Sequence, residues 1–194
     1  MSCIAIIPAR GGSVRIPRKN IRAFCGKPII EYSIQTAIAS CLFDDIYVST
    51  DDDEIEKVAT SAGAKVMRRE VDDGQKGTQE VARDLLEKLS NLPDYVCVIY
   101  ATSPLLLPQD LHDGLRALKK GPGRVFSMSV GDSPLADAGG YYWGLPGAFL
   151  FNVPLIGPNT SMVPLPPERI CDINTLADWS TATYLYQALR RAQP

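Results

Sequence analysis

The sequence predicts an α/β fold in which a mainly parallel central sheet is flanked by helices. Three observations lead to this prediction. Strand-like and helix-like segments alternate along the first 120 residues, the strand-like segments are apolar runs typical of strands buried on both faces, and the helical segments carry apolar residues at helical spacing. Because parallel strands in this order are joined by right-handed crossovers, ligand sites are expected at the carboxyl ends of the strands.

The expected strands are short and rich in β-branched residues. The first covers residues 4–7 and ends at Pro8. Residues 154–167 are rich in proline and are expected to be irregular. The remaining strands are expected at residues 46–50, 65–67, 95–100, 124–130 and 141–152. Glycine and proline separate the last two.

The helices are expected between these strands and at the end of the chain. Pro28 can begin the first helix, because a proline at the first helical position loses no internal hydrogen bond. The residues that share its apolar face are Ile30, Ile34, Ala37 and Ile38. Asp51 and Glu54 have the spacing of a capping box, for a helix that ends near Gly63. Periodicity predicts further helices at residues 78–89, 110–120 and 175–192, the last capped by Asn174 or Thr175.

Composition narrows the class of protein. A chain of 194 residues with 45% hydrophobic content fits one well-buried core, so a single domain is expected. The net charge of -2 argues against nucleic-acid binding. The sequence shows neither a signal peptide nor an apolar run of membrane-spanning length, which predicts a cytoplasmic protein. Five cysteines without a C-x-x-C pair favour neither disulfides nor a zinc site.

The loop at residues 9–13 is the strongest local signal for a ligand. Gly11 and Gly12 let backbone N–H groups converge on an anion, and Arg10 and Lys19 bracket the loop with positive charge. A triphosphate is the natural ligand for such a loop; the alternative is a glycine turn with solvated charges. The sequence contains neither G-x-x-x-x-G-K-[ST] nor G-x-G-x-x-G, so a P-loop and the usual dinucleotide fingerprint are both excluded.

Several ordered motifs together resemble one known family. They are IIPARGGS at residues 6–13, RIPRKNI at 15–21, GKP at 26–28, VSTDD at 48–52, YATSP at 100–104, DAG at 137–139, YWG at 142–144, DINT at 172–175 and DW at 178–179. In this order they resemble the acylneuraminate (CMP-sialic acid synthetase) cytidylyltransferase family, and especially its pseudaminic acid branch.

The resemblance implies a Rossmann-like nucleotidyltransferase fold and a reaction. CMP would pass from CTP to a small acidic acceptor, such as a nonulosonic keto-sugar acid, with Mg²⁺ as cofactor and release of pyrophosphate. Residues 1–120 would bind the nucleotide, and residues 121–194 would hold the acceptor and the metal. A homodimer is a further expectation, and neither nucleic acid nor membrane is expected as a partner. The alternatives are a smaller acid such as a phosphonate, or a nucleotide-binding homologue with little or no catalysis.

The resemblance also assigns roles to residues. Arg10 and Lys19 would act in catalysis, and Asp172 with Asn174 would face the metal. An arginine after the third strand, Arg68 or Arg69, would face the cytosine. The other residues assigned to the nucleotide are Ala9, Gly11, Gly12, Ser13, Asn20, Thr78, Ala101, Thr102 and Ser103. The chemistry needs no covalent nucleophile, because nucleotidyl transfer depends on positioning and electrostatic stabilisation. The lone His112 is expected to be a surface or packing residue.

The acceptor side is expected to use polar and aromatic side chains. Asp137, Tyr141 and Tyr142, followed by Trp143, are the candidates, because aromatic walls with a few polar groups are typical of small-molecule pockets. Packing within a strand is the alternative role of these aromatic residues.

Three features depart from the family pattern. Val14 stands where the family loop has lysine, and Asn174 stands where the family has the second aspartate of an Asp-x-Asp pair. An amide carbonyl is a weaker Mg²⁺ ligand than a carboxylate. Only residues 131–136 stand where related enzymes carry an extended arm used in dimer contacts and in closing over the sugar acid. We therefore expect CTP to be retained more securely than sialic or pseudaminic acid.

Overall fold

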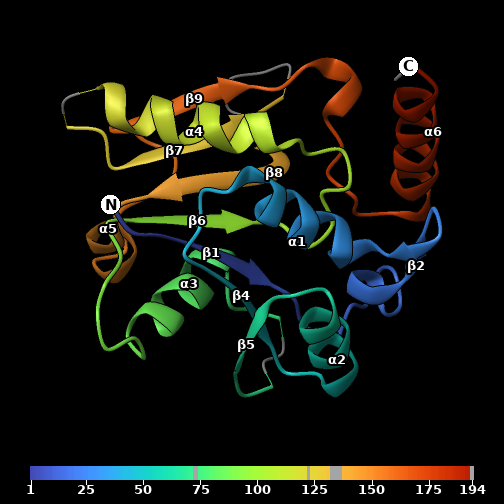
Figure 1. Cartoon of the computed structure of the whole chain (residues 1–194), viewed down its shortest axis with the longest axis horizontal. Helices are drawn as coiled ribbons and strands as arrows, with labels where there is room; N and C mark the ends of the chain where they lie inside the picture. The colour runs from blue at the N-terminus through green and yellow to red at the C-terminus, as the bar shows by residue number, and fades with distance from the viewer. Residues whose placement is uncertain (72–73, 122, 132–136, 193–194) are drawn as a thin grey trace.

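A seven-stranded sheet forms the centre of the molecule (Figure 1). The computed structural model describes residues 1–71, 74–121, 123–131 and 137–192. The strand order is β5-β4-β1-β6-β8-β7-β9, and β8 runs antiparallel to both of its neighbours while the other pairs are parallel. The sheet strands are β1 (Cys3–Pro8), β4 (Asp45–Thr50), β5 (Lys65–Arg68), β6 (Tyr95–Ile99), β7 (Phe126–Val130), β8 (Asp137–Gly144) and β9 (Thr160–Pro164). The mainly parallel sheet predicted from the sequence is confirmed.

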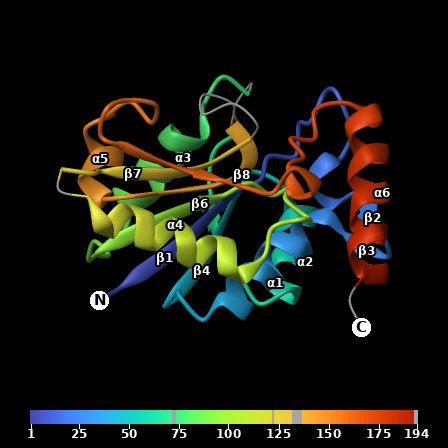
Figure 2. The ribbon, with the colours of Figure 1, turned by 90° about the horizontal axis from the view of Figure 1, so that it is seen from above.

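Helices cover both faces of this sheet (Figure 2). One face packs against α1 (Ile29–Ser40), α2 (Asp53–Ser61) and α4 (Pro108–Lys120). The other packs against α3 (Thr78–Leu86) and α5 (Pro146–Leu150). No helix in the described part of the chain is both long and apolar enough to cross a membrane.

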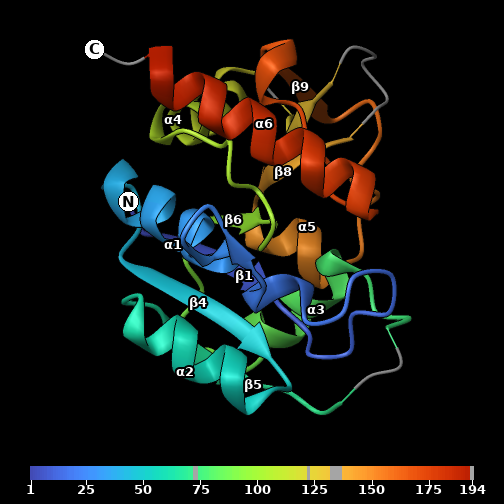
Figure 3. The ribbon, with the colours of Figure 1, turned by 90° about the vertical axis from the view of Figure 1, so that its right-hand side faces the viewer.

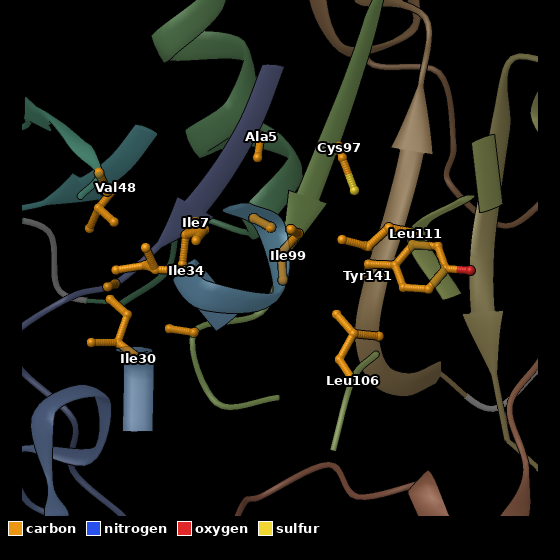
Figure 4. Close-up of a cluster of buried hydrophobic side chains, with 14 of the residues drawn as sticks. Ala5, Ile7, Ile30, Ile34, Val48, Cys97, Ile99, Leu106, Leu111 and Tyr141 are labelled. Carbon is orange, nitrogen blue, oxygen red and sulfur yellow. The ribbon is translucent and has the colours of Figure 1, made fainter. Parts of the chain in front are cut away.

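The alternation of side chains along β1 shows why this strand is central. Ala5 and Ile7 belong to the core under α1, α2 and α4, whereas Ile4 and Ile6 belong to the core under α3 and α5. Figure 4 shows part of the first core, with Ala5 and Ile7 beside residues of neighbouring elements. Each fully buried isoleucine contributes about 1.5–3 kcal/mol of hydrophobic free energy. The short apolar run that ends at Pro8 therefore anchors both layers.

A third cluster packs the C-terminal helix α6 (Leu176–Ala192) against the start of α1, and Figure 1 shows α6 beyond one end of the sheet. It packs on a small hairpin formed by β2 (Ala23–Phe24) and β3 (Lys27–Pro28). The ring of Phe24 meets those of Tyr32, Trp179 and Tyr186 edge to face, at centroid distances of 5.5, 5.6 and 5.6 Å. Such pairs add about 0.5–1.5 kcal/mol each beyond the area they bury. The docked helix fixes the segment just before it.

Two expected elements differ from the structure. The strand expected at residues 141–152 is only half right, because β8 begins at Asp137 and ends at Gly144, and the chain then turns into α5. Pro146 starts that helix at a position where its missing N–H costs no hydrogen bond. The proline-rich residues 154–167 are not entirely irregular, since Thr160–Pro164 forms β9, a strand at the edge of the sheet that pairs with β7.

Two details of the helices also differ. The cap of α2 is Asp52 and not Asp51: an Asp52 side-chain oxygen accepts hydrogen bonds from the N–H groups of Glu54 and Ile55 at 2.9 and 3.0 Å. Ile38 was expected on the buried face of α1, but it is 41% exposed, near the end of that helix.

Candidate functional site

A cleft of about 200 Å³ opens at the carboxyl ends of β1 and β6, the edge where the parallel topology predicts a ligand. Its walls come from the loop after β1, the end of β5, the start of α3, the turn after β6 and the segment before α6. The lining residues are Pro8, Arg10, Ser13, Val14, Arg15, Ile16, Lys19, Asn20, Arg69, Lys76, Thr78, Val81, Tyr100, Ala101, Thr102 and Asn174.

In the part of the chain that the structure describes, the charged side chains that line the cleft are all basic. The basic side chains are Arg10, Arg15, Lys19, Arg69 and Lys76, and none of the described lining residues is acidic. The protein as a whole carries a net charge of -2, so the positive charge is concentrated in the cleft. A cleft with this lining is suited to an anion of high charge.

The loop after β1 is held by the β4–α2 turn. The Gly11 N–H donates to an Asp51 carboxylate oxygen at 2.8 Å, and the Ala9 N–H donates to the Ser49 carbonyl at 2.9 Å. A Cβ atom on Gly11 would lie 2.5 Å from Asp52 Oδ2 and 2.9 Å from Asp52 Cβ, so a side chain at this position would displace Asp52. The close approach of the two segments fixes the shape of the loop.

Arg18 adds an electrostatic clamp to the same contact. Its guanidinium donates to both oxygens of Asp52, at 2.5 and 3.0 Å, and to Glu54 at 2.6 Å. The hydrogen bond from Arg18 is the main cause that lowers the pKa of Asp52 to about 2, and the backbone donors of the α2 cap add to it. Arg18 itself has a left-handed backbone, with φ of 56°. The clamp connects the loop to the N-terminus of α2.

Asn20 and Lys19 connect the loop to itself and to the end of the chain. The buried Asn20 amide donates to the Arg10 carbonyl at 2.9 Å, which holds the loop closed. The Lys19 ammonium donates to the Ile173 carbonyl at 2.8 Å. Burial lowers the pKa of Lys19, and the charges of Arg15 and Arg10 lower it further against the opposing effect of Asp172.

Not all residues assigned to the loop face the cleft. Arg10, Ser13, Lys19 and Asn20 line it, as do Thr78, Ala101 and Thr102 from the other walls. Ala9, Gly11, Gly12 and Ser103 are not among the lining residues. Ala9 is buried in the core, and the Ser103 hydroxyl donates to the Gly139 carbonyl at 2.7 Å. Ala9 and Gly11 hold the loop through their backbone N–H groups, and Ser103 holds its turn through its hydroxyl.

Of the two adjacent arginines at the end of β5, Arg69 is among the residues that line the cleft and Arg68 is not. Arg68 points away, where its guanidinium pairs with Asp53 at 3.0 Å and with Glu56 at 3.2 Å on α2. Arg69 lines the cleft, and burial lowers its pKa. Adjacent residues at the end of a strand point to opposite faces, so only one of the two can reach the ligand. The expectation for Arg68 is corrected on this ground.

The aromatic residues assigned to the acceptor lie mostly in the core. Tyr141 and Tyr142 are fully buried, and Figure 4 shows the Tyr141 ring among apolar side chains. The expectation that Tyr141 faces an acceptor is therefore corrected, since β8 is an interior strand with both faces covered. Tyr142 reaches the cleft only indirectly, because its hydroxyl donates to Thr78 Oγ1 at 2.8 Å.

Asp137 is linked to the cleft through Tyr100. The Tyr100 hydroxyl donates to Asp137 Oδ2 at 2.6 Å, and Tyr100 lines the cleft beside Ala101. Burial, reinforced by the charge of Asp137, raises the pKa of Tyr100 well above its usual value, so the phenol keeps its proton. Tyr100 is not among the site residues expected from the sequence, although it directly precedes the Ala101 turn. Residues 132–136, which belong to the segment where a shortened arm is expected from the sequence, lie outside the described part.

Asp172 and Asn174 lie side by side before α6. The Asn174 amide donates to Asp172 Oδ2 at 2.5 Å, and the Asn174 N–H donates to Asp178 at 2.9 Å. Asn174 lines the cleft, whereas Asp172 does not. In the described residues there is no group of three or more His, Cys, Asp or Glu side chains arranged to hold a metal. The pair nevertheless offers a carboxylate and an amide carbonyl, which fits Mg²⁺ because that ion takes one or two carboxylates together with substrate phosphates.

The remaining polar candidates lie elsewhere. His112 is on α4, where its Nε2 lies 3.0 Å from the Ser40 carbonyl, which agrees with a packing role. Cys3 and Cys97 are buried, whereas Cys25 and Cys41 are exposed. Arg15, Ile16 and Lys76 line the cleft without having been assigned to a ligand from the sequence.

Comparison with known proteins identifies sequence relatives. A family model described as cytidylyltransferase matches residues 4–137. The pseudaminic acid cytidylyltransferase of Campylobacter jejuni subsp. jejuni serotype O:2 is 33% identical over 225 residues, covering 96% of this chain and 97% of the relative. Because that alignment is longer than the 194 residues of this chain, the relative carries segments that this chain lacks.

Solved structures share the fold. A CMP-2-keto-3-deoxy-manno-octonic acid synthetase complexed with CTP superposes with a TM-score of 0.76 at 16% identity, covering 97% of this chain and 100% of that one. A Mycobacterium tuberculosis protein in complex with manganese superposes with a TM-score of 0.65 at 14% identity, covering 96% and 98%. The nucleotidyltransferase fold expected from the sequence is confirmed.

Proposed function

Because this chain belongs to the cytidylyltransferase family, we propose that it transfers CMP from CTP to a small keto-sugar acid and releases pyrophosphate. The observation that carries the proposal is the cleft itself, whose described lining contains five cationic side chains and no acidic one. A triphosphate has the charge that such a lining neutralises, and the site lies where the fold places its ligand.

The nucleotide is assigned to the part of the cleft built by residues 1–120. Arg10 and Lys19 neutralise the triphosphate, and Asn20 keeps the loop in its closed shape. Arg69 takes the role at the base that the resemblance gave to one of two adjacent arginines. Thr78 and the Ala101 turn lie along the nucleotide on the facing wall.

The reaction needs a new bond from an acceptor hydroxyl oxygen to the α-phosphorus. That bond forms as the bond from the α-phosphorus to the bridging oxygen breaks, so the electron pair leaves with pyrophosphate while the hydroxyl proton is lost. Arg10 and Lys19 stabilise the charge that grows on the leaving group. Because the Lys19 ammonium is held by the Ile173 carbonyl, it needs little rearrangement during the reaction.

Residues 121–194 are assigned to the acceptor and the metal. Asp172 and Asn174 would hold a Mg²⁺ ion, which would supply positive charge next to the phosphates when bound. Asp137 acts on the acceptor side through Tyr100, the phenol that it orients at the cleft. A relative of this chain is a pseudaminic acid cytidylyltransferase, so a nonulosonic acid is the acceptor class we propose. A smaller acid such as a phosphonate is the alternative acceptor. It is suggested by the alignment with that relative, which spans 225 residues, whereas this chain has 194.

The test is pyrophosphate release from CTP and Mg²⁺ across a panel of pseudaminic acid, sialic acid, other keto-sugar acids and small phosphonates. Release with one acid, abolished by omission of Mg²⁺, supports the transferase and identifies its acceptor class. CTP binding without release from any acid would favour a nucleotide-binding homologue, for which the neutral Asn174 beside Asp172 is the specific observation. Absence of CTP binding would contradict both.

A further inference from the structure

We propose that Lys76 is a phosphate-binding residue of this cleft, which supplies a cation that the loop after β1 does not provide at Val14. This inference rests on the proposed function, because it takes CTP as the ligand. It adds a residue from another segment of the chain to the loop residues already assigned.

The loop after β1 has an uncharged gap on its cleft side. Val14 lines the cleft between Ser13 and Arg15, yet its apolar side chain is 86% exposed and packs into no core. An exposed valine contributes neither charge nor a hydrogen bond to an anion. At this one position the loop offers no charged side chain to an anion, so a cation from another wall of the cleft can act there.

The segment that carries Lys76 closes on that loop. A Cβ atom on Gly74 would lie 1.4 Å from an Arg10 guanidinium nitrogen, and Gly74 has a φ of +83°, so the backbone passes directly against Arg10 in a conformation that favours glycine. Lys76 follows two residues later and lines the same cleft as Arg10 and Val14. Figure 3 shows the blue loop after β1 and the green segment before α3 on the same side of the molecule.

Lys76 can leave its ion pair with Asp84 without leaving the Asp84 carboxylate unpaired. Its ammonium lies 2.6 Å from an Asp84 oxygen, and its side chain is 49% exposed. Exposed ion pairs of this kind contribute little to stability, so exchange for a phosphate is favourable. Asp84 also pairs with Arg83 at 3.3 Å, and that partner remains when Lys76 moves. Lysine has a flexible four-carbon stem, which suits such a movement.

The experiment compares ligands that differ only in phosphate. Dissociation constants for CTP, CMP and cytidine are measured by calorimetry for the wild type, Lys76→Met and Lys88→Met. Lys88 is the matched control, because it is an exposed lysine shortly after α3 that does not line the cleft. We expect Lys76→Met to weaken CTP binding about tenfold, the typical effect of one charge-assisted hydrogen bond, with cytidine unaffected. Lys88→Met should leave all three ligands unchanged.

A second variant tests whether the charge can be supplied from the loop. Adding Val14→Lys to Lys76→Met should restore most of the lost CTP affinity, because both positions line the same cleft. Equal loss for CTP and cytidine, or no loss for CTP, would overturn the inference and leave the proposed function intact. Failure of the wild type to bind CTP would overturn the proposed function, and this inference with it.

Discussion

The Lys19 ammonium donates a hydrogen bond to the carbonyl of Ile173, a residue 154 positions later in the chain. This contact joins the two parts of the cleft, because Ile173 lies between Asp172 and Asn174. It also orients a half-buried cation, so the loss of Lys19 affects both charge and position. The first prediction follows from this double role.

Lys19→Met should lower kcat by about 100-fold and weaken CTP binding, since it removes a preorganised cation from the leaving-group side. Pyrophosphate release and calorimetry measure the two effects, and circular dichroism checks that the fold is retained. Lys57→Met, an exposed lysine on α2, is the control and should behave like the wild type. Equal activity of the two variants would contradict the role of Lys19.

Asn174→Asp should strengthen the metal site, because a second carboxylate replaces an amide beside Asp172. The expected result is a several-fold lower Mg²⁺ concentration for half-maximal activity, measured by titration of the metal at saturating CTP. Asn159→Asp adds the same charge at an exposed position outside the cleft and serves as the control. An unchanged Mg²⁺ requirement in Asn174→Asp would place the metal elsewhere.

Tyr100→Phe and Asp137→Ala should raise the KM of the acceptor by a similar factor, because the first removes the donor and the second the acceptor of the same 2.6 Å hydrogen bond. The KM of CTP should change little. The combined variant should resemble either single one, since both disrupt one pair. A selective effect on CTP would instead place Tyr100 on the nucleotide.

Tyr141→Phe should stabilise the protein or leave its stability unchanged. In the described part of the chain the fully buried Tyr141 hydroxyl has no hydrogen-bond partner, and such a group costs about 1–3 kcal/mol. Urea denaturation should show a midpoint equal to or above that of the wild type, with activity retained. Tyr184→Phe, at a residue that is 72% exposed, is the control and should shift the free energy of unfolding by less than about 0.5 kcal/mol. A clear destabilisation by Tyr141→Phe would show that the hydroxyl is satisfied.

The pKa of Asp52 predicts a contribution to acid sensitivity. This pKa is about 2 in the folded protein against 3.8 for an unperturbed carboxyl, so the stabilisation is fully present above pH 3.8 and is lost as the pH falls toward 2. Its size should be on the order of 1 kcal/mol, because Arg18 is partly exposed and solvent screens the pair.

Asp52→Asn retains a capping side chain but removes the charge. It should therefore be less stable than the wild type at pH 7, with the difference shrinking between pH 4 and pH 2. Urea denaturation across this range measures it. A difference that is constant with pH would contradict the electrostatic origin.

The sheet can be predicted from the sequence because the patterns that indicate strands and helices are local in the chain. Apolar runs such as residues 4–7 and the alternation with helices depend only on neighbouring residues, and the structure confirms both. The glycine loop could be located for the same reason, since it directly follows a strand. Its Gly11 is explained only by the structure, in which Asp52 approaches from a different element.

The parts that could not be predicted depend on contacts between distant segments. Arg68 and Arg69 are adjacent and chemically identical, and only the position of α2 decides which one leaves the cleft. Likewise, β8 carries consecutive aromatic residues whose burial follows from the helices that cover both of its faces. Lys76 gave no sequence signal, because it reaches the cleft from a segment that only the folded chain brings against Arg10.

The docking of α6 on the Phe24 hairpin has a consequence for synthesis of the protein. The Ile173 carbonyl, which accepts the hydrogen bond from Lys19, precedes this helix. The helix itself is held by aromatic contacts with Phe24. During translation the sheet and the loop can form from the emerging chain, but the last wall of the cleft is absent until residues 176–192 have left the ribosome. A nascent chain therefore completes its anion-binding cleft only after α6 has emerged and docked on the hairpin.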